Sequence, residues 1–407
     1  MIDKIEDNIT QEDIEANKKE VFQNILMSLY SYSPAKIYSI EQILLMDAIQ
    51  ANDNEKIIKL SNLMLQGALI SSSYADAQKL LYNILSRMPN PTLIEDGKLN
   101  TKFLLLSLVN IEILFNVGDY ANCIEVGEDI LKVLTPDSIE SIKPKNFSID
   151  LFIEHLLETF RLIAFAKLIA NDNDIETFFD RVCNAIGEEL PEKKAIITLK
   201  KYIAGSDYIP SQVEDESPVS KIIYLILQEL SILKDDYKNF AQNIYQAKLL
   251  SSDLHQTQLE YICDLLIAYA YAKKGIYKKA NIIFNDILEK SENSSLFNVI
   301  QITRYLMAKI KWLKDEKDDV LIIINEALSD IRNHKNEAVV LYALLEKLYI
   351  DTQKESISQE ELQIEHEKLI GLSPNGELER IVKSSSFNKE ETKDFSDEDS
   401  TKTEVHS

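Results

Sequence analysis

Apolar residues between Leu265 and Leu288 recur at helical spacing on both sides of one glycine, Gly275. Spacings of three and four residues are typical of a helix that buries one face. Glycine ends a helix readily, because it adopts the left-handed backbone conformation without a steric penalty from a Cβ atom. After the glycine, Tyr277, Ala280 and Phe284 continue the apolar spacing. The pattern therefore predicts two amphipathic helices joined by a tight turn.

The same pattern recurs along the chain, with Tyr74, Tyr120, Ile175, Tyr237 and Lys317 at the position of Tyr277. The last three copies are spaced 40 residues apart, and the earlier gaps are longer. Two segments rich in proline and polar residues, 137–148 and 206–218, account for the extra length and are predicted to be loops or short extra helices. The residues that define the copies are Tyr74, Ala77, Gly118, Tyr120, Ala268, Tyr271, Gly275, Tyr277, Ala280, Phe284 and Ala327.

This pattern resembles the tetratricopeptide repeat, which has a small residue on its first helix, glycine and tyrosine at the turn, and alanine and aromatic positions on its second helix. The copy around Gly275 matches best. The others depart from it: Cys123 and Phe240 stand where the family prefers alanine, and Gly127 where it prefers an aromatic residue. The resemblance spans roughly 57–332 and implies an all-α, right-handed solenoid of helix-turn-helix repeats.

The chain divides into five predicted parts. We expect an acidic, flexible N-terminus (1–17), N-terminal capping helices (18–56), the repeat array (57–332), C-terminal capping helices (333–370) and a disordered acidic tail (371–407). Capping helices are expected because one repeat buries too little apolar surface to fold alone and its stability comes from neighbours. The tail is read as a solubilising segment, with docking on a basic partner or phosphorylation of Ser396 and Ser400 as alternatives.

Composition supports helices and argues against several partners. Only nine glycines and nine prolines occur in 407 residues, which favours helices with short connections. The formal net charge of −23 repels phosphate, so we expect neither nucleic acid nor an anionic membrane as partner. The apolar run "FLLLSLVNIEILF" is too short for a membrane span and contains Glu112. Without a secretory signal or paired cysteines, a cytoplasmic location is the default expectation.

No sequence motif for catalysis is present. Phosphate-binding loops, the HExxH pattern and the GxSxG pattern do not occur, and the five histidines and three cysteines are scattered. We therefore expect no catalytic residues, no cofactor and no metal site.

The first helix of each pair is predicted to line a concave groove, as the resemblance implies. Aromatic and basic side chains there would contact a peptide or amphipathic helix of another protein. The alternative is that these side chains pack between helices, because the superhelix is tightly wound. The predicted partner-binding residues are Phe115, Phe160, Lys167, Tyr269, Tyr305, Lys309 and Trp312. Other positions predicted on this inner face include Glu112, Ile163, Ile262 and Ile302.

The sequence thus favours a non-catalytic scaffold or adaptor. Two alternatives remain open: a constitutive subunit of a larger complex, and an enzyme or small-molecule sensor that uses the groove as a pocket.

Overall fold

The computed structural model describes residues 34–53, 56–61, 63–64, 74–86, 92–142, 149–206, 217–232, 237–254, 256–332, 337–354, 356–373, 378 and 381–382. Within them the chain is almost entirely helical, which confirms the all-α prediction; the strands β1 (Ile94–Glu95) and β2 (Lys98–Leu99) form a short antiparallel hairpin. The helices are α2 (Pro34–Gln50), α4 (Tyr74–Leu85), α5 (Thr101–Val117), α6 (Tyr120–Val133), α7 (Pro136–Ser141), α8 (Ile149–Ile169), α9 (Ile175–Ile186), α10 (Lys193–Ile203), α11 (Pro218–Ile232), α12 (Tyr237–Asp253), α13 (Thr257–Lys273), α14 (Tyr277–Ser294), α15 (Phe297–Leu313), α16 (Lys317–Ile331), α17 (Val339–Gln353) and α18 (Gln359–Ile370).

The second helix of each predicted pair begins where the pattern places it. The helices α4, α6, α9, α12, α14 and α16 start at Tyr74, Tyr120, Ile175, Tyr237, Tyr277 and Lys317. Residues three, seven and ten positions after these starts are buried wherever their side chains are described, as Ala280, Phe284 and Ile287 are in α14. These positions share one face of a helix. Each second helix therefore packs through a single repeated stripe.

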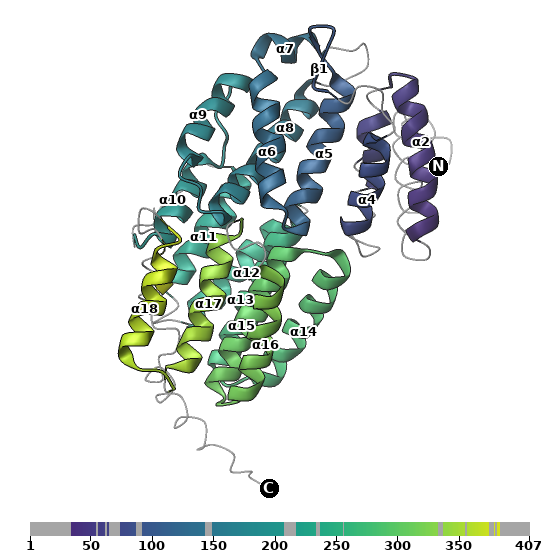
Figure 1. The fold of residues 1–407 in the computed structure, drawn as a ribbon. Coiled ribbons are helices and arrows are strands. Elements are labelled where there is room, and N and C mark those ends of the chain that lie inside the picture. The colour runs from purple at the N-terminus through teal and green to yellow at the C-terminus, as the bar shows by residue number, and fades with distance from the viewer. Residues whose placement is uncertain are drawn as a thin grey trace, which may run out of the picture.

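The first helices are buried on more sides than the second helices. In α5, 11 of 17 residues are buried, whereas α6 buries 4 of 14. The difference arises because α5 contacts α4, α6, α8 and α15 at once. The helices α13, α15 and α17 form a similar inner row, in which α15 contacts both of the others (Figure 1). The pairs are therefore arranged with first helices inside and second helices outside.

The turn between α5 and α6 illustrates how the pairs form. The side chain of Asn100 accepts a hydrogen bond from the Phe103 N–H at 3.2 Å and so caps the start of α5. The helix ends at Gly118, whose φ of 84° is left-handed, and the side chain of Asp119 caps α6 by accepting the Asn122 N–H at 3.3 Å. Two residues thus reverse the chain and place α6 antiparallel to α5.

Hydrogen bonds join helices of the first half of the chain to helices that lie far away in the sequence. The hydroxyl of Tyr120 at the start of α6 donates a hydrogen bond to the side chain of Asn298 in α15. The side chain of Gln258 in α13 donates to that of Asn116 in α5. In Figure 1 the helices α13, α15 and α17 accordingly lie below the ends of α5, α6 and α8. Within the described residues, early and late helix pairs are therefore in direct contact, as expected if the pairs wind tightly.

Two segments differ from the predicted organisation. The sequence did not assign α10, an amphipathic helix that packs against α8 and α11 and explains much of the long gap before α12. The insertion after α6 begins with a short helix, α7, capped by reciprocal hydrogen bonds between Thr135 and Ser138. Most of the second predicted insertion, 207–216, lies outside the described residues.

Two apolar residues of the predicted C-terminal tail (371–407) are buried. Leu378 is fully buried against Val339 and Val340 of α17, and Val382 is buried against Ile350 of the same helix. These apolar side chains extend the core beyond the capping helices, which the polar composition around them concealed. The predicted flexible N-terminus (1–17) and the acidic residues after 382 lie outside the described residues. Of the predicted N-terminal cap (18–56), the structure describes only residues 34–53 and 56.

Candidate functional site: a cavity between the inner helices

The inner helices surround a cavity of about 350 Å³. Its walls come mainly from α5, α8, α11 and α13, with single residues from α4, α10 and α17 and two from α15. Most of the lining side chains are apolar, and they include Phe115, Leu162, Phe165, Ile226, Ile262 and Ile302. The volume lies at the lower end of the range found for ligand pockets, and mostly apolar walls with a few polar groups are typical of such sites.

Arg161, which lines the cavity, joins two distant parts of the chain by a hydrogen bond. Arg161 of α8 is 8% exposed and donates hydrogen bonds to the carboxylate of Glu158 at 3.0 Å and to the side-chain oxygen of Gln256 at 3.1 Å. Gln256 immediately precedes α13, so the guanidinium group links α8 to a segment 95 residues away. Arg161 is thus already engaged with protein acceptors.

The half-buried Glu112 of α5 also lines the cavity, and its carboxyl group makes no hydrogen bond or ion pair with the described residues. Its pKa is raised from 4.5 to about 8, mainly by burial and also by the nearby Glu158 carboxylate, while Arg161 opposes the shift. The carboxyl group is therefore mainly protonated at pH 7. Burying an acid without a partner is unfavourable, and such groups are concentrated at functional sites.

We expect the Glu112→Gln variant to be more stable than the wild-type protein at pH 8 and equally stable at pH 4. Below pH 4.5 the carboxyl is protonated in both the folded and the unfolded chain, so its shift has no effect. As the pH rises towards 8, the unfolded chain loses this proton while the folded chain retains it, and stability falls. Glutamine mimics the neutral acid, so the gain at pH 8 is roughly a few kcal/mol. Urea denaturation at both pH values measures it.

The exposed Glu125 of α6 provides the control, because Glu125→Gln removes a carboxylate of the same size from the surface. Its effect should be small and nearly independent of pH. A Glu112→Gln gain that is equal at pH 4 and pH 8 would contradict the raised pKa of Glu112.

Of the seven predicted partner-binding residues, Phe115 alone is among those that line the cavity. Phe160 is fully buried and packs edge-on against Phe178 of α9, with ring centroids 6.2 Å apart. Its assignment to a partner surface is corrected to the helix–helix core. Three other inner-face positions, Glu112, Ile262 and Ile302, do line the cavity.

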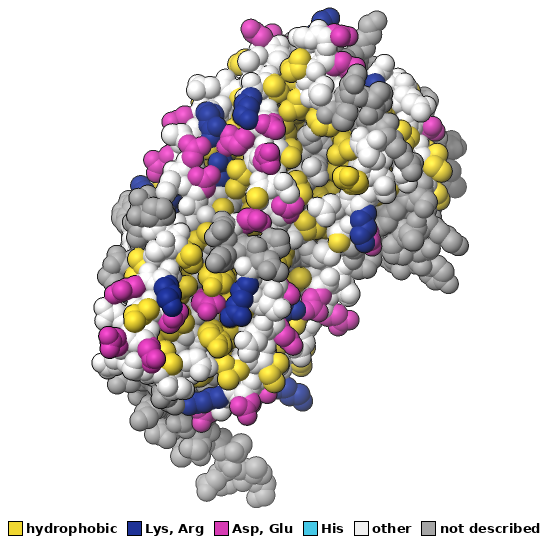
Figure 2. Space-filling view, in the orientation of Figure 1, with side chains coloured by type: hydrophobic (Ala, Val, Ile, Leu, Met, Phe, Trp, Pro, Cys, Tyr) yellow, Lys and Arg dark blue, Asp and Glu magenta, His cyan; other side chains and the backbone are white. Residues whose placement is uncertain are grey.

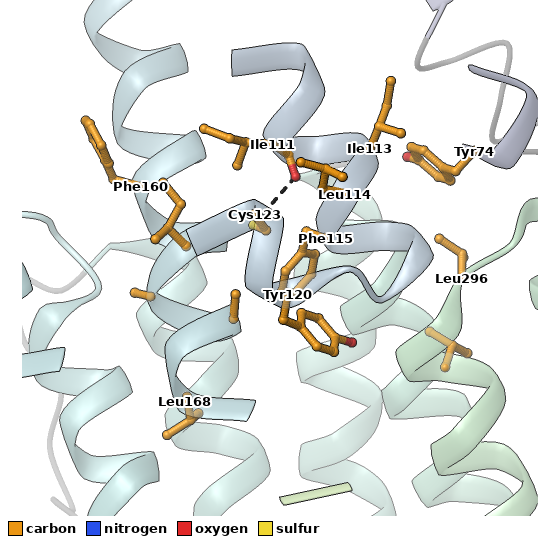
Figure 3. Close-up of a cluster of buried hydrophobic side chains, with 14 of the residues drawn as sticks. Tyr74, Ile111, Ile113, Leu114, Phe115, Tyr120, Cys123, Phe160, Leu168 and Leu296 are labelled. Atoms are coloured by element: carbon orange, nitrogen blue, oxygen red, sulfur yellow. Dashed lines mark hydrogen bonds between the residues drawn. The ribbon is translucent and has the colours of Figure 1, made fainter. Parts of the chain in front are cut away.

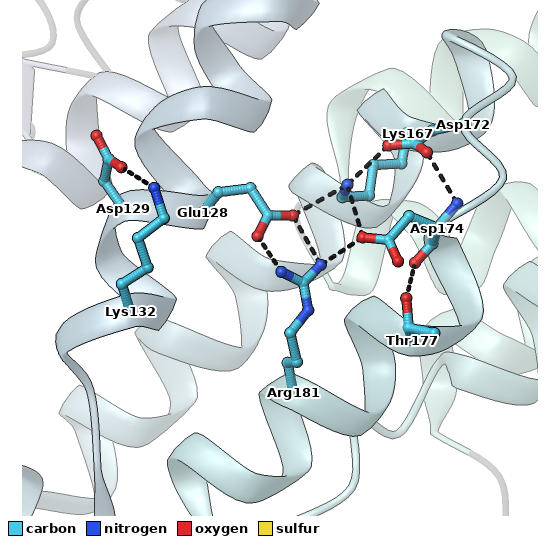
Figure 4. Close-up of polar contacts among 8 residues, drawn as sticks. All are labelled: Glu128, Asp129, Lys132, Lys167, Asp172, Asp174, Thr177 and Arg181. Atoms are coloured by element: carbon cyan, nitrogen blue, oxygen red, sulfur yellow. Dashed lines mark hydrogen bonds and ion pairs between the residues drawn. The ribbon is translucent and has the colours of Figure 1, made fainter.

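Lys167 likewise belongs to the interior rather than to a partner surface. Its side chain is 3% exposed, and its ammonium group lies 2.7 Å from the Asp172 carboxylate and 3.0 Å from that of Glu128 (Figure 4). Arg181 of α9 pairs with Glu128 from the outer side. Burial alone would raise the pKa of Asp172, but hydrogen bonds from Lys167 and the Asp174 N–H lower it below its usual value. This cluster ties α6, α8 and α9 together.

The remaining four predicted residues gather elsewhere, on α13 and α15. The Lys309 ammonium lies 5.6 Å from the ring centroid of Tyr269 and 5.5 Å from that of Tyr305. Trp312 is half-buried, with Lys317 of α16 over its ring at 5.5 Å. Cation–π contacts of this kind stabilise packing between neighbouring helices. These residues do not line the cavity.

The repeat-defining residues Tyr74 and Tyr120 are part of the hydrophobic core, as is Cys123 (Figure 3). The thiol of Cys123 is buried and faces the backbone carbonyl of Ile111 at 3.8 Å. Burial raises its pKa above the ordinary value and raises that of the Cys263 thiol to about 12. Neither thiol is therefore an effective nucleophile at neutral pH.

Among the described residues, no group of three or more histidine, cysteine, aspartate or glutamate side chains is placed to hold a metal ion. In the same part of the chain, no helix combines the length and the apolar character that crossing a membrane requires. No protein-family model matches the sequence, and a search of curated proteins finds no significant match.

The sequence placed Glu112 on the predicted inner face but gave no indication of Glu158 and Arg161, the other charged residues of the cavity. Glu158 and Arg161 lie on a helix rich in apolar residues, but so do many surface charges, and their spacing of three is common on exposed helix faces. Glu112 gave a stronger signal, because it is the single charged residue in "FLLLSLVNIEILF". A carboxyl group within an otherwise apolar helix marks a position that needs an explanation.

Proposed function

We propose that this protein is a non-catalytic binding protein, a scaffold or adaptor built from helix pairs like those of tetratricopeptide repeats. Its inner helices hold an apolar segment of another protein in the cavity between α5, α8, α11 and α13. The observation that carries the proposal is this cavity, whose walls are mostly apolar and come from nearly every inner helix. A lined interior space of this kind favours binding over a purely structural core, since protein cores are otherwise closely packed.

The tetratricopeptide-like arrangement is supported by the repeated stripe of buried residues on the second helices. The same positions after each helix start are buried in pairs that differ in sequence, which is expected of stacked repeats. A solenoid that presents first helices on its inner side would place variable side chains around one interior space. This is the geometry with which such a scaffold would recognise a partner.

The outer surface offers a weaker candidate for binding. Ile282 on α14 and Ile322 on α16 are 62% and 59% exposed and occupy equivalent repeat positions. On the face drawn in Figure 2, however, acidic and basic side chains are interspersed and the apolar ones are scattered among them. Single exposed apolar residues are ordinary on protein surfaces. The interior cavity is therefore the better-supported site.

The test is site-specific photocrosslinking with an aliphatic diazirine amino acid close to isoleucine in size, because a larger probe would itself fill the cavity. We expect the crosslinker at Ile226, which lines the cavity, to capture a protein partner that affinity purification with mass spectrometry has identified. The same crosslinker at Ile322 on α16 serves as the surface control and should capture little of that partner. A partner captured from Ile322 and not from Ile226 would instead favour a constitutive subunit that binds through its outer helices.

A further inference from the structure

The polar groups of the cavity are unevenly satisfied. Arg161 is bound by Glu158 and Gln256 on two sides, whereas the carboxyl group of Glu112 has no hydrogen-bonding partner among the described residues. The charged residues lining the cavity are two carboxyl groups and one guanidinium group. An anionic ligand would meet two carboxyl groups and an arginine that is already engaged, whereas a cationic ligand gains a partner when Glu112 ionises.

We propose that the segment held in the cavity carries a lysine, whose ammonium group pairs with the Glu112 carboxylate while neighbouring apolar groups fill the rest of the space. The inference rests on the proposed function, because it concerns the same cavity. An ammonium group provides both a positive charge and three hydrogen-bond donors on a flexible stem, and a charge-assisted bond is the strongest kind available to a buried carboxylate. The apolar walls accommodate the stem and the adjacent side chains.

Pairing requires a change of protonation at Glu112. In the unliganded protein the acid is mainly neutral at pH 7, because burial raises its pKa to about 8. When the ammonium group binds, Glu112 releases its proton to solvent and becomes a carboxylate, and the ligand keeps its own proton. Binding therefore releases up to one proton per ligand below pH 8, and affinity increases as the pH rises from 6 to 8.

The surroundings of Glu112 contain few other groups that titrate in this range. His155 lies on α8, interacts with Glu158, and has a pKa lowered by burial, so it stays neutral at pH 7. Glu158 and Arg161 face the cavity from α8 and remain paired with each other. The other polar groups of the lining are Tyr74 from α4, Asn116 from α5, Thr257 and Gln258 from α13 with the preceding Gln256, and Asn298 from α15.

The experiment uses n-octylammonium chloride, 1-octanol and sodium octanoate as matched probes in isothermal titration calorimetry with the full chain. At pH 8 we expect octylammonium to bind about tenfold or more tightly than octanol, and octanoate to bind most weakly. In Glu112→Gln, an isosteric variant, octylammonium and octanol should bind equally. At pH 7, wild-type titrations in two buffers of different ionisation heat should show proton release with octylammonium and none with octanol.

Ile226→Trp, which fills the cavity, separates the two levels of the proposal. If all probes lose affinity in this variant but octanol binds the wild-type protein as tightly as octylammonium, the cavity binds ligands and the lysine inference is overturned. If octylammonium does not bind, or if Ile226→Trp leaves its affinity unchanged, the cavity is not the binding site. The lysine inference and the proposed function of the cavity are then both overturned. A preference for octylammonium that persists in Glu112→Gln assigns the charge recognition to another residue and also overturns it.

Discussion

Gly118→Ala is expected to lower the free energy of unfolding by about 3–5 kcal/mol, several times the effect of Gly275→Ala. Both glycines end a first helix with a left-handed backbone, with φ values of 84° and 77°. A side chain in this conformation costs about 1–2 kcal/mol at either position. Only Gly118 adds a collision, because a Cβ atom there would lie 2.5 Å from the ring of Phe297 in α15, whereas nothing lies within 4 Å at Gly275.

The collision matters because it lies where the turn between α5 and α6 contacts α15. Phe297 packs edge-on against Tyr120 at a centroid distance of 6.4 Å, next to the hydrogen bond between Tyr120 and Asn298. Moving Phe297 therefore disturbs the junction between α5, α6 and α15. Chemical denaturation of Gly118→Ala, Gly275→Ala and the wild-type protein gives the comparison.

A double variant tests the cause. Phe297→Ala removes the ring that the new methyl group would strike, so Gly118→Ala should destabilise the Phe297→Ala background by only about 1–2 kcal/mol. Equal losses for the two glycine variants in the wild-type background would mean that α15 does not approach this turn.

Lys167→Met is expected to be the second strongly destabilising change, with a loss of about 3–5 kcal/mol near neutral pH. The substitution leaves the Asp172 and Glu128 carboxylates without their buried cation, while methionine keeps a similar length and fills the space. Arg181, at 43% exposure, still pairs with Glu128 and limits the loss. Thermal and urea unfolding of the purified variant measure the effect.

Lys132→Met is the matched control, since Lys132 pairs with Asp129 at the same distance of 2.7 Å, but with both side chains exposed (Figure 4). Stability should be unchanged within error, because exposed ion pairs are screened by water.

The pH dependence of stability gives a further check on Lys167. The lowered pKa of Asp172 stabilises the wild-type protein above the unfolded pKa of about 3.8, and this contribution disappears as the pH falls below that value.

The difference between wild type and Lys167→Met should therefore shrink between pH 6 and pH 3. A loss that is equally large at both pH values would assign the role of Lys167 to packing of its aliphatic stem and not to its charge.

Much of the local structure could be predicted from the sequence. Helix starts at Tyr74, Tyr120 and Tyr277 follow from turn residues and apolar spacing, both of which act within a few residues of the position concerned. The helix α10 escaped prediction because it stands outside the paired pattern. The burial of Leu378 and Val382 escaped because two apolar residues in a polar segment carry little signal.

The cavity could be predicted only in part. Its apolar side was anticipated at Phe115, Ile262 and Ile302, since their positions on first helices place them on the inner face. Its polar end depends on Arg161 meeting Gln256 across 95 residues, and no local pattern encodes that approach.

The sequence alone therefore determined the helices, their pairing and the stripe that each second helix buries, because neighbouring residues decide these through backbone preference and apolar spacing. Only the tertiary structure decided how tightly the pairs wind. That winding depends on contacts such as Gly118 against Phe297 and Asn171 against Ser373, which join residues more than 170 positions apart. It decided that the inner helices line a cavity, and it placed the carboxyl group of Glu112 at the cavity wall without a hydrogen-bonding partner among the described residues.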